Sequence, residues 1–292
     1  GDILDGAPGD SLSIQTSGGT PATVAECIRL IEARLPGANA VSREPVPLRE
    51  LKLAMQCGGS DGHSGVSCNP ALGYACDLLV RHGGTAILSE TTEAYGAEHV
   101  LTARAATPEV GQKLVDRISW WEEFAAGRGL VINNNPSPGN KAGGLTTIIE
   151  KSLGSIAKGG TTNLNEVYAY AEPVEAGKGL VFMDAPAFDP VGATAQVAGG
   201  ANVMVFTTGR GSAFGCKPAP SIKLIDNTRM YQLMPDDMDI NAGTILDGEE
   251  TVEQCGQQIF ERIIAVASGE RTKSEMLGYG EEEFCPWDLG IM

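Results

Sequence analysis

Residues 51–88 read LKLAMQCGGSDGHSGVSCNPALGYACDLLVRHGGTAIL. Two apolar runs in this stretch, 51–56 and 85–88, do not alternate with polar residues, which is typical of strands buried on both faces. Between them, a Gly-rich polar loop at 57–70 leads into a segment with helical spacing at 71–83. A strand, a loop, a helix and a second strand in this order indicate a buried parallel sheet.

The same unit recurs along the chain. Short apolar runs that end in polar loops lie at 130–132, 180–183, 203–206 and 221–225. Helical spacing is found at 23–35, where Pro36-Gly37 is expected to end the helix, and at 145–153 and 251–268. We therefore predict an α/β fold: a mostly parallel sheet with flanking helices, and a site in the Gly-rich loops at the strand carboxyl ends. We expect residues 1–15 to be a tail or truncated edge and residues 16–292 to form a single α/β catalytic domain.

Composition excludes several classes of partner. The 292 residues include 21 Lys and Arg but 37 Asp and Glu, a formal net charge of −16. Sequence-independent nucleic-acid binding needs a dense cationic face, and anionic membranes also attract cations, so neither partner is expected. No apolar run approaches the roughly 18 residues of a membrane helix, and the start GDILDGAPGD has no apolar signal-peptide core. The seven cysteines form no CxxC pair, so we expect reduced thiols and a cytoplasmic protein.

Two loops offer candidate metal ligands and proton carriers. The loop CGGSDGHSG (57–65) contains Cys57, Ser60, Asp61 and His63. Cysteine, aspartate and histidine are competent metal ligands, and a neutral imidazole or a carboxylate can move a proton. The alternative is a turn with polar surface residues. Glu90 directly follows the apolar run 85–88 and could act as a base or a metal ligand, whereas the nearby Glu93 and Glu98 are expected to be solvated carboxylates.

The stretch NNNPSPGNKAGG (133–144) predicts an anion cradle. Asn135 and Asn140 supply amides, and Lys141 supplies a cation beside Gly143-Gly144. Backbone N–H groups at a Gly-rich helix start favour an anion, and a lysine with a lowered pKa could also serve as a base. The Walker A spacing is absent. The alternative is a capped loop with a solvated lysine.

Three later loops carry further polar candidates. In TTGRGSAFG (207–215), Arg210 suits bidentate capture of a carboxylate, and Thr208 lies beside it. In DDMDIN (236–241), Asp237 and Asp239 have strand spacing on one face and could serve a divalent ion or sugar hydroxyls. The alternative for that segment is an exposed acidic turn. The loop DAPAFDP (184–190) offers two more aspartates, Asp184 and Asp189.

Taken together, the motifs resemble the altronate/galactarate dehydratase family. The resemblance runs from about Thr16 to the carboxyl terminus and covers the carboxyl-terminal part of the family. It is carried by MQCGGSDGHSG with NPALG, LLVRHGGTAILSET, YGAEHVLT, NNNPSPGNKAGGLTTIIEKSLG, KGGTTNL, QVAGGANVMVFTTGRGSAFGCKPAPSIK, DMDINAG and SGERTKSEMLGYGEEEF. It implies dehydration of a sugar acid such as altronate or galactarate to a 2-keto-3-deoxy acid. The divalent metal it implies is iron(II) in particular, with Mn²⁺ and Mg²⁺ as other candidates.

The implied reaction is a β-elimination that needs a carboxylate holder, a base and stabilisation of the developing negative charge. On this resemblance Lys141 and Arg210 hold the substrate carboxylate. The base stays open among Lys141, Glu90 and His63. The metal candidates are Cys57, Asp61 and Glu90, with His63 as a further one, and the remaining substrate-binding candidates are Ser60, Asn135, Asn140, Thr208, Asp237 and Asp239.

Two other functions and two kinds of assembly remain open. Sulfolactate sulfo-lyases are relatives that eliminate sulfite, and the chain could also be a sugar-acid-binding fragment without chemistry. Full-length members of the family carry an amino-terminal domain and a middle segment that this chain lacks, so we expect a missing domain or a small subunit as partner. We also expect a homo-oligomer. The apolar residues of 251–268 could pack internally or against a second subunit.

Overall fold

The computed structural model describes residues 11–281, 283–288 and 290. Its contacts divide the chain into two compact units, one ending at Pro45 and the other beginning at Val46. The sequence predicts one domain from residue 16, whereas the compact α/β unit starts at Val46. Residues 1–10 of the predicted tail lie outside the described residues.

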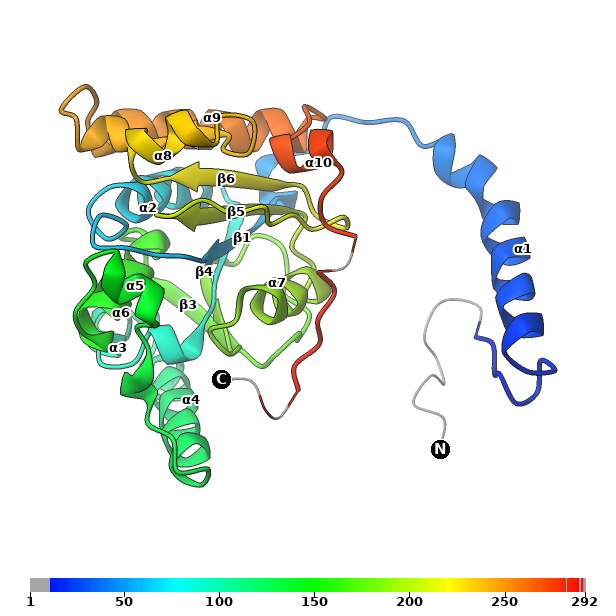
Figure 1. The fold of residues 1–292 in the computed structure, drawn as a ribbon, viewed down its shortest axis with the longest axis horizontal. Helices are drawn as coiled ribbons and strands as arrows, with labels where there is room; N and C mark the ends of the chain where they lie inside the picture. The colour runs from blue at the N-terminus through cyan, green and yellow to red at the C-terminus, as the bar shows by residue number, and fades with distance from the viewer. Residues whose placement is uncertain (1–10, 282, 289, 291–292) are drawn as a thin grey trace. The chain divides into compact units, whose positions relative to one another are not determined.

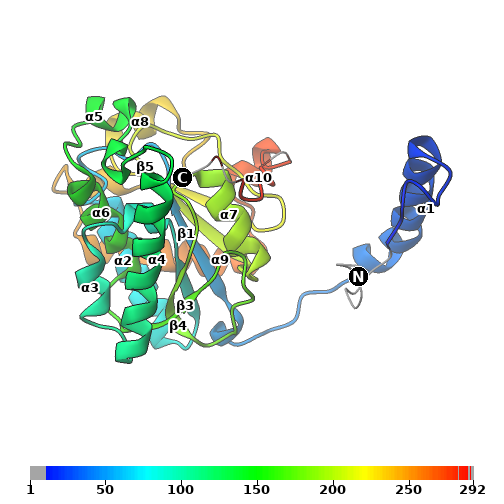
Figure 2. The ribbon, with the colours of Figure 1, turned by 90° about the horizontal axis from the view of Figure 1, so that it is seen from below.

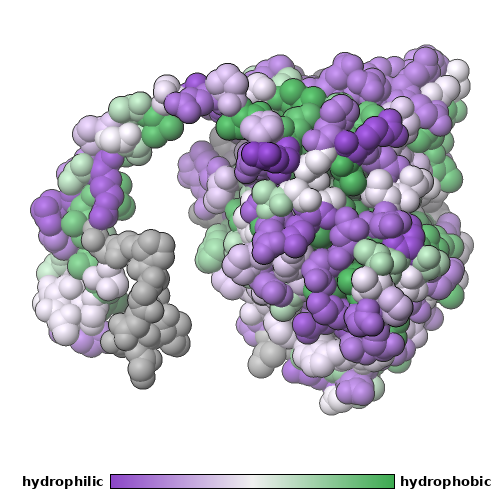
Figure 3. Space-filling view, turned by 180° about the vertical axis from the view of Figure 1, so that it is seen from behind, coloured by the Kyte–Doolittle hydropathy of each residue, from purple (hydrophilic) through white to green (hydrophobic). Residues whose placement is uncertain are grey.

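The first unit contains one long helix, α1 (Thr20–Asn39). The predicted helix at 23–35 is confirmed, but Pro36-Gly37 does not end it. Proline removes a single backbone donor, and the last turn still closes through Ala40 N–H, which donates to Gly37 O at 3.2 Å. The helix exposes both hydrophobic and hydrophilic side chains (Figure 3). Its exposed apolar residues, each between 46% and 59% accessible, are Val24, Ile28, Ile31 and Leu35.

The second unit is built on one parallel sheet. In the described part of the chain, seven strands lie in the order β3-β4-β2-β1-β5-β6-β7, and every neighbouring pair is parallel. This confirms the predicted α/β class. The strands are β1 (Lys52–Cys57), β2 (Thr85–Leu88), β3 (Leu164–Tyr168), β4 (Gly179–Met183), β5 (Val203–Thr208), β6 (Ser221–Ile225) and β7 (Ile240–Asn241).

Helices cover both faces of the sheet, because its strands are apolar on both faces. They are α2 (Cys68–Arg81), α3 (Glu98–Thr102), α4 (Pro108–Ala126), α5 (Pro138–Ala142), α6 (Ile148–Ile156), α7 (Asp189–Ala198), α8 (Thr228–Leu233), α9 (Val252–Ala267) and α10 (Lys273–Leu277). Leu53 and Met55 of β1 pack in one core with α2 and α9, whereas Ala54 packs in a second core with α7. Figure 2 shows α2 and α7 on opposite sides of the strands.

The predicted helix at 251–268 is confirmed as α9. The Thr251 side chain caps the helix by accepting from Gln254 N. The Gln254 side chain in turn accepts from Thr251 N, which completes a capping box. Its apolar stripe is buried in the main core, and Gly256 lets the helix lie against Tyr74 of α2. The apolar face of this helix therefore packs internally.

The strands of the structure differ from the sequence prediction at three places. The run 130–132 is not a strand: Leu130 and Val131 are 43% and 60% exposed, and a 3₁₀ turn begins at Ile132. Strand β3 was not predicted, because its edge position leaves Asn165 exposed and breaks the apolar run. The strand expected over 236–241 is reduced to the two residues of β7.

The arrowheads of β5 and β6 point toward the side on which α5 and α6 lie (Figure 1). The carboxyl edge of the sheet is therefore covered by the segments that follow the strands. Hydrophobic residues on the face drawn in Figure 3 are scattered among hydrophilic ones. Among the described helices, none combines the length and apolar character required to cross a bilayer.

Candidate active site

A cavity of about 410 Å³ opens at the carboxyl edge of the sheet. Segments that are distant in sequence form its wall, because the carboxyl ends of parallel strands meet at one edge. They are the end of β1 with Gly58 and Gly59, the turn after β2, the segment from Leu130 to Asn140, Lys151 of α6, the start of α7 and the loop after β5. The polar side chains on the wall are Cys57, Thr92, Glu93, Asn135, Ser137, Asn140, Lys151, Asp189 and Arg210.

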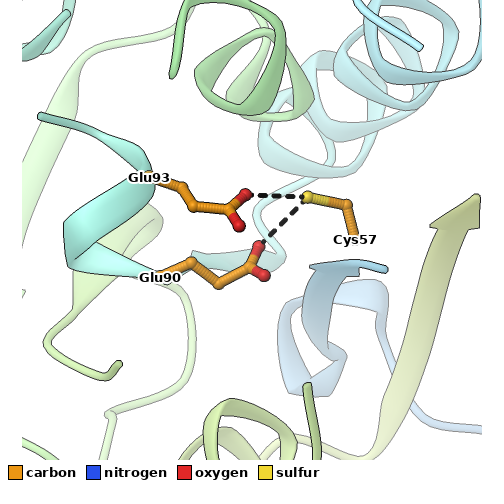
Figure 4. Close-up of side chains that lie close together, drawn as sticks. All are labelled: Cys57, Glu90 and Glu93. Carbon is orange, nitrogen blue, oxygen red and sulfur yellow. Dashed lines mark hydrogen bonds between the residues drawn. The ribbon is translucent and has the colours of Figure 1, made fainter. Parts of the chain in front are cut away.

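Cys57, Glu90 and Glu93 form a buried group, which we call the acid–thiol cluster (Figure 4). Cys57 also lines the cavity. Cys57 Sγ lies 3.4 Å from Glu90 Oε2 and 3.5 Å from Glu93 Oε2. One donor atom from each of the three residues lies within 4.8 Å of the others. Glu93, expected from the sequence to be solvated, is buried and lines the cavity.

Two lysines balance the charge of the cluster. Lys158 Nζ lies 2.6 Å from Glu90 Oε2 and donates to Cys57 Sγ at 2.9 Å. Lys151 Nζ lies 2.6 Å from Glu93 Oε1 and donates to Asn135 Oδ1 at 2.9 Å. Burial of four charged groups is tolerated here because each carboxylate has an ammonium partner.

The backbone at Glu90 is held in a costly conformation. Its φ of 72° and ψ of 64° are left-handed, a region that non-glycine residues rarely adopt. This conformation begins the 3₁₀ turn Thr91–Glu93, which brings Glu90 and Glu93 toward Cys57. Backbone strain of this kind is concentrated at functional sites, so it is consistent with a role for this turn.

Burial and the charges in the cluster shift its pKa values. Burial raises the pKa of Glu90, and the ammonium of Lys158 opposes that change. Burial lowers the pKa of Lys158, but Cys57 and Glu90 outweigh it, so the pKa ends above its usual value. Burial and then Glu90 raise the pKa of the Cys57 thiol. Without a metal, the cluster therefore contains a neutral thiol beside charged lysines.

The acid–thiol cluster has the donors that a divalent metal requires. Glu90 Oε1 is buried and has no hydrogen-bond partner among the described atoms, so it is available as a ligand. A sulfur with carboxylate oxygens suits iron(II) or another borderline transition metal better than Mg²⁺. Because Lys151 and Lys158 already balance the carboxylates, binding of a dication fits best when Cys57 loses its proton. The three residues therefore fit a divalent transition metal, as the family resemblance leads us to expect.

Two charged side chains lie on the cavity wall without a partner of opposite charge. The Arg210 guanidinium donates weakly through Nε to Gly59 O at 3.4 Å and pairs with no carboxylate among the described residues. The Asp189 carboxyl has no hydrogen-bond or ion-pair partner in the described part of the chain. Glycines make room for both: a methyl at Gly139 would overlap the Arg210 guanidinium, and a methyl at Gly58 would overlap Asp189 Oδ2 and the Phe206 ring.

A second acidic group lies beside the cavity. Ser64 Oγ donates to Asp226 Oδ2 at 2.5 Å and lies 3.4 Å from Asp61 Oδ1. Asp61 also accepts from the backbone N–H of His63 and Ser64, which fixes the loop. Burial and then the Asp61 carboxyl raise the pKa of Asp226 to about 7. Asp61, expected as a metal ligand, lies in this group and not in the acid–thiol cluster.

The structure brings some of the predicted site residues together. Cys57 and Glu90 belong to the acid–thiol cluster, and Asn135, Asn140 and Arg210 line the cavity. Asn140 Nδ2 donates to Ser60 O at 2.7 Å, which ties the two loops together. Ser60 and Thr208 are buried beside the cavity, where Thr208 Oγ1 accepts from Arg210 N.

Other predicted residues lie outside the cavity. Lys141 is exposed on α5. The His63 side chain is 57% exposed, and its Nδ1 lies 3.7 Å from Asp61 Oδ2. Asp239 accepts from Lys223 N and Lys273 N, so it joins β6 to α10, and Asp237 Oδ1 lies 3.9 Å from Lys223 Nζ.

Sequence reasoning missed four residues of the site. Lys151 and Lys158 lie in and after a predicted helix, where a lysine normally faces solvent. Glu93 follows Glu90 by three residues, and only the tight turn directs both inward. Asp226 directly follows β6, a position that the rule on strand carboxyl ends could have identified.

The fold and site define a parallel α/β domain whose carboxyl edge holds acids, a thiol and ammonium groups around a cavity. Residues 48–292 match the family described as D-galactarate/Altronate dehydratase, C-terminal. The chain belongs to this family, and it matches the carboxyl-terminal domain.

Named relatives agree with that assignment. The chain is 45% identical over 262 residues to galactarate dehydratase (L-threo-forming) of Escherichia coli (strain K12), which covers 89% of this chain and 50% of the relative. It is 39% identical to altronate dehydratase of Bacillus subtilis (strain 168), covering 84% and 49%. It is 34% identical to the beta subunit of (2R)-sulfolactate sulfo-lyase of Chromohalobacter salexigens, covering 89% and 67%. The chain thus spans about half the length of these two dehydratases.

Proposed function

We propose that the protein containing this chain dehydrates a sugar acid by β-elimination of water and forms a 2-keto-3-deoxy acid. The observation that carries the proposal is the cavity itself. An unpaired guanidinium, a buried ammonium and a group of metal-ligating donors converge on a space of about 410 Å³, which suits a small polyhydroxylated acid. The family and the names of the dehydratase relatives support the reaction class.

The residues of the cavity can bind and orient such a substrate. The Arg210 guanidinium offers two parallel donors that match a carboxylate. Asn135 and Asn140 bring amide groups to the wall, where sugar hydroxyls need polar partners. Lys151, fixed by Glu93 and Asn135, brings a positive charge to the wall, where negative charge on a substrate carboxylate would develop.

The proposed metal would be held by Cys57, Glu90 and Glu93. When bound, it would stabilise the negative charge that develops as the proton beside the carboxylate is removed. A metal there would need deprotonated donors, and the side chains of all three residues are buried. We infer iron(II) from the sulfur and carboxylate donors, with Mn²⁺ and Mg²⁺ as less well matched ions.

The test is an anaerobic turnover assay on the full-length protein as the gene encodes it. Galactarate, altronate and (2R)-sulfolactate are offered in turn with iron(II), and 2-keto-3-deoxy acid and sulfite are measured separately. We expect keto acid from a sugar acid, and we expect a chelator to abolish it. Sulfite from sulfolactate would instead support a sulfo-lyase. Binding of a sugar acid by calorimetry without any product would support a binding protein.

A matched pair of variants links turnover to the cavity. Arg210→Gln removes the proposed carboxylate holder and is expected to raise the KM for the sugar acid. Arg229→Gln, on α8 and outside the residues that line the cavity, removes the same charge and is the control. Equal kinetic changes in both variants would contradict the assignment of Arg210.

A further inference from the structure

The side chain of Asp189 stands apart from every other carboxylate at the cavity. Glu93 is paired with Lys151, and Glu90 with Lys158. Asp184, from the same loop as Asp189, accepts from Thr91 Oγ1 at 2.6 Å and from Trp121 Nε1 at 2.8 Å. Asp189 lines the cavity and has no such partner among the described residues. Asp189 is half-buried on the cavity wall, so its carboxyl is open to a molecule in the cavity.

The chain makes specific room for this carboxyl. Asp189 is the first residue of α7, and its Oδ2 lies against the backbone of Gly58, directly after Cys57. Any side chain at position 58 would overlap that oxygen. The carboxyl is therefore placed beside the acid–thiol cluster and open to the cavity.

From this geometry we propose that Asp189 is the general acid that protonates the leaving hydroxyl of the substrate. This inference rests on the proposed dehydration and adds to it the residue that assists departure of water. Arg210, the proposed carboxylate holder, lines the same cavity as Asp189. With the substrate carboxylate on Arg210, the hydroxyl on the next carbon but one would face Asp189. A positioned acid of this kind accelerates such a step by roughly 10²- to 10⁴-fold.

Burial, followed by the charges of Glu90 and Glu93, raises the pKa of Asp189. The carboxyl therefore lies within electrostatic reach of the acid–thiol cluster.

The C2–H bond breaks, its proton passes to a base of the site, and its electron pair forms the C2=C3 double bond. The C3–O bond breaks, and the departing oxygen takes the Asp189 proton and leaves as water. The resulting enol ketonises to the 2-keto-3-deoxy acid. Asp189 regains a proton from solvent, which receives the proton that the base took.

The leaving group provides a test. Fluoride needs no proton to depart, so we compare the sugar acid with its analogue that carries fluorine in place of the C3 hydroxyl. In the full-length protein, we expect Asp189→Asn to lower keto-acid formation from the sugar acid by about 10²- to 10⁴-fold. Fluoride release from the analogue, measured with an ion-selective electrode, is expected to stay within about tenfold of the wild-type rate.

Controls separate this role from structural damage. Asp116→Asn, on the exposed face of α4, removes a carboxylate away from the cavity and is expected to change neither rate. Asp189→Ser is a second variant without an acid, for use if the asparagine variant fails to fold by circular dichroism. Equal losses on both substrates, or no loss on either, would overturn the role of Asp189. Absence of both reactions in the wild-type protein would refute the proposed function, and this role with it.

Discussion

Lys158 and Glu90 form a completely buried ion pair, with Nζ and Oε2 2.6 Å apart and both side chains 0% exposed. The same ammonium donates to Cys57 Sγ, so a single cation serves two members of the acid–thiol cluster. An isolated buried charge is far more costly than a paired one. The fold of the site therefore depends on this lysine irrespective of any metal.

Lys158→Met is expected to lower the free energy of unfolding by about 3–5 kcal/mol, because it leaves the buried Glu90 carboxylate without a partner. Urea unfolding followed by circular dichroism measures the change. The control is Lys113→Met, which breaks the exposed pair with Glu166 and is expected to cost at most about 1 kcal/mol. Similar losses in the two variants would contradict the importance of the buried pair.

Asp226 is expected to make stability depend on pH. The pKa of the Asp226 carboxyl is about 7 in the folded protein, against a usual value of 3.8. The native state therefore binds this proton more tightly than the unfolded chain does. The stabilisation is complete below pH about 4 and is lost as pH rises through about 7. Over that pH range the free energy of unfolding of the wild-type protein should fall by an amount on the order of a few kcal/mol, and Asp226→Asn should remove this fall. Urea midpoints from pH 4 to 8 test this, and an unchanged slope in the variant would disprove it.

Gly139→Ala is expected to displace the Arg210 guanidinium, because the added methyl would occupy its position. Loss of a charge-assisted hydrogen bond costs about 1.5–3 kcal/mol, so the KM for the sugar acid should rise by about 10- to 100-fold. Steady-state kinetics measures this, and thermal unfolding checks that the fold persists. Gly37→Ala in α1, with open space around the position, is the control. An unchanged KM would show that Arg210 does not hold the carboxylate.

The acid–thiol cluster is expected to bind cobalt(II) with a thiolate-to-metal charge-transfer band. Cys57→Ser should abolish that band, because the sulfur donor is gone. Glu93→Gln should keep the band but weaken affinity by at least about tenfold, as loss of a coordinating or supporting carboxylate does. Absorption titration measures both. Cys76→Ser, a buried cysteine of α2 outside the cluster, is the control. A band that persists in Cys57→Ser would exclude this cysteine as a ligand.

Local sequence patterns predicted most of the fold. Continuous apolar runs such as 203–206 indicated strands buried on both faces, and helical spacing indicated α2 and α9, because burial on a sheet imposes these periods. The pattern failed where burial was partial. The run 130–132 lines a cavity and does not pair with a strand, and β3 is a partly exposed edge.

The sequence by itself determined the parallel α/β class and the family, and it predicted Cys57, Glu90 and Arg210 as candidates for one site. Each of the three residues lies at the end of a strand or just after it, and chain direction alone places strand ends at one edge. Only the tertiary structure decided that Glu93, Lys151 and Lys158 turn inward, that Asp61 joins Asp226 and that Lys141 faces solvent. A lysine or glutamate is stable in the core only beside an opposite charge from a distant segment. The spacing of residues along the chain does not predict which distant residue supplies that charge.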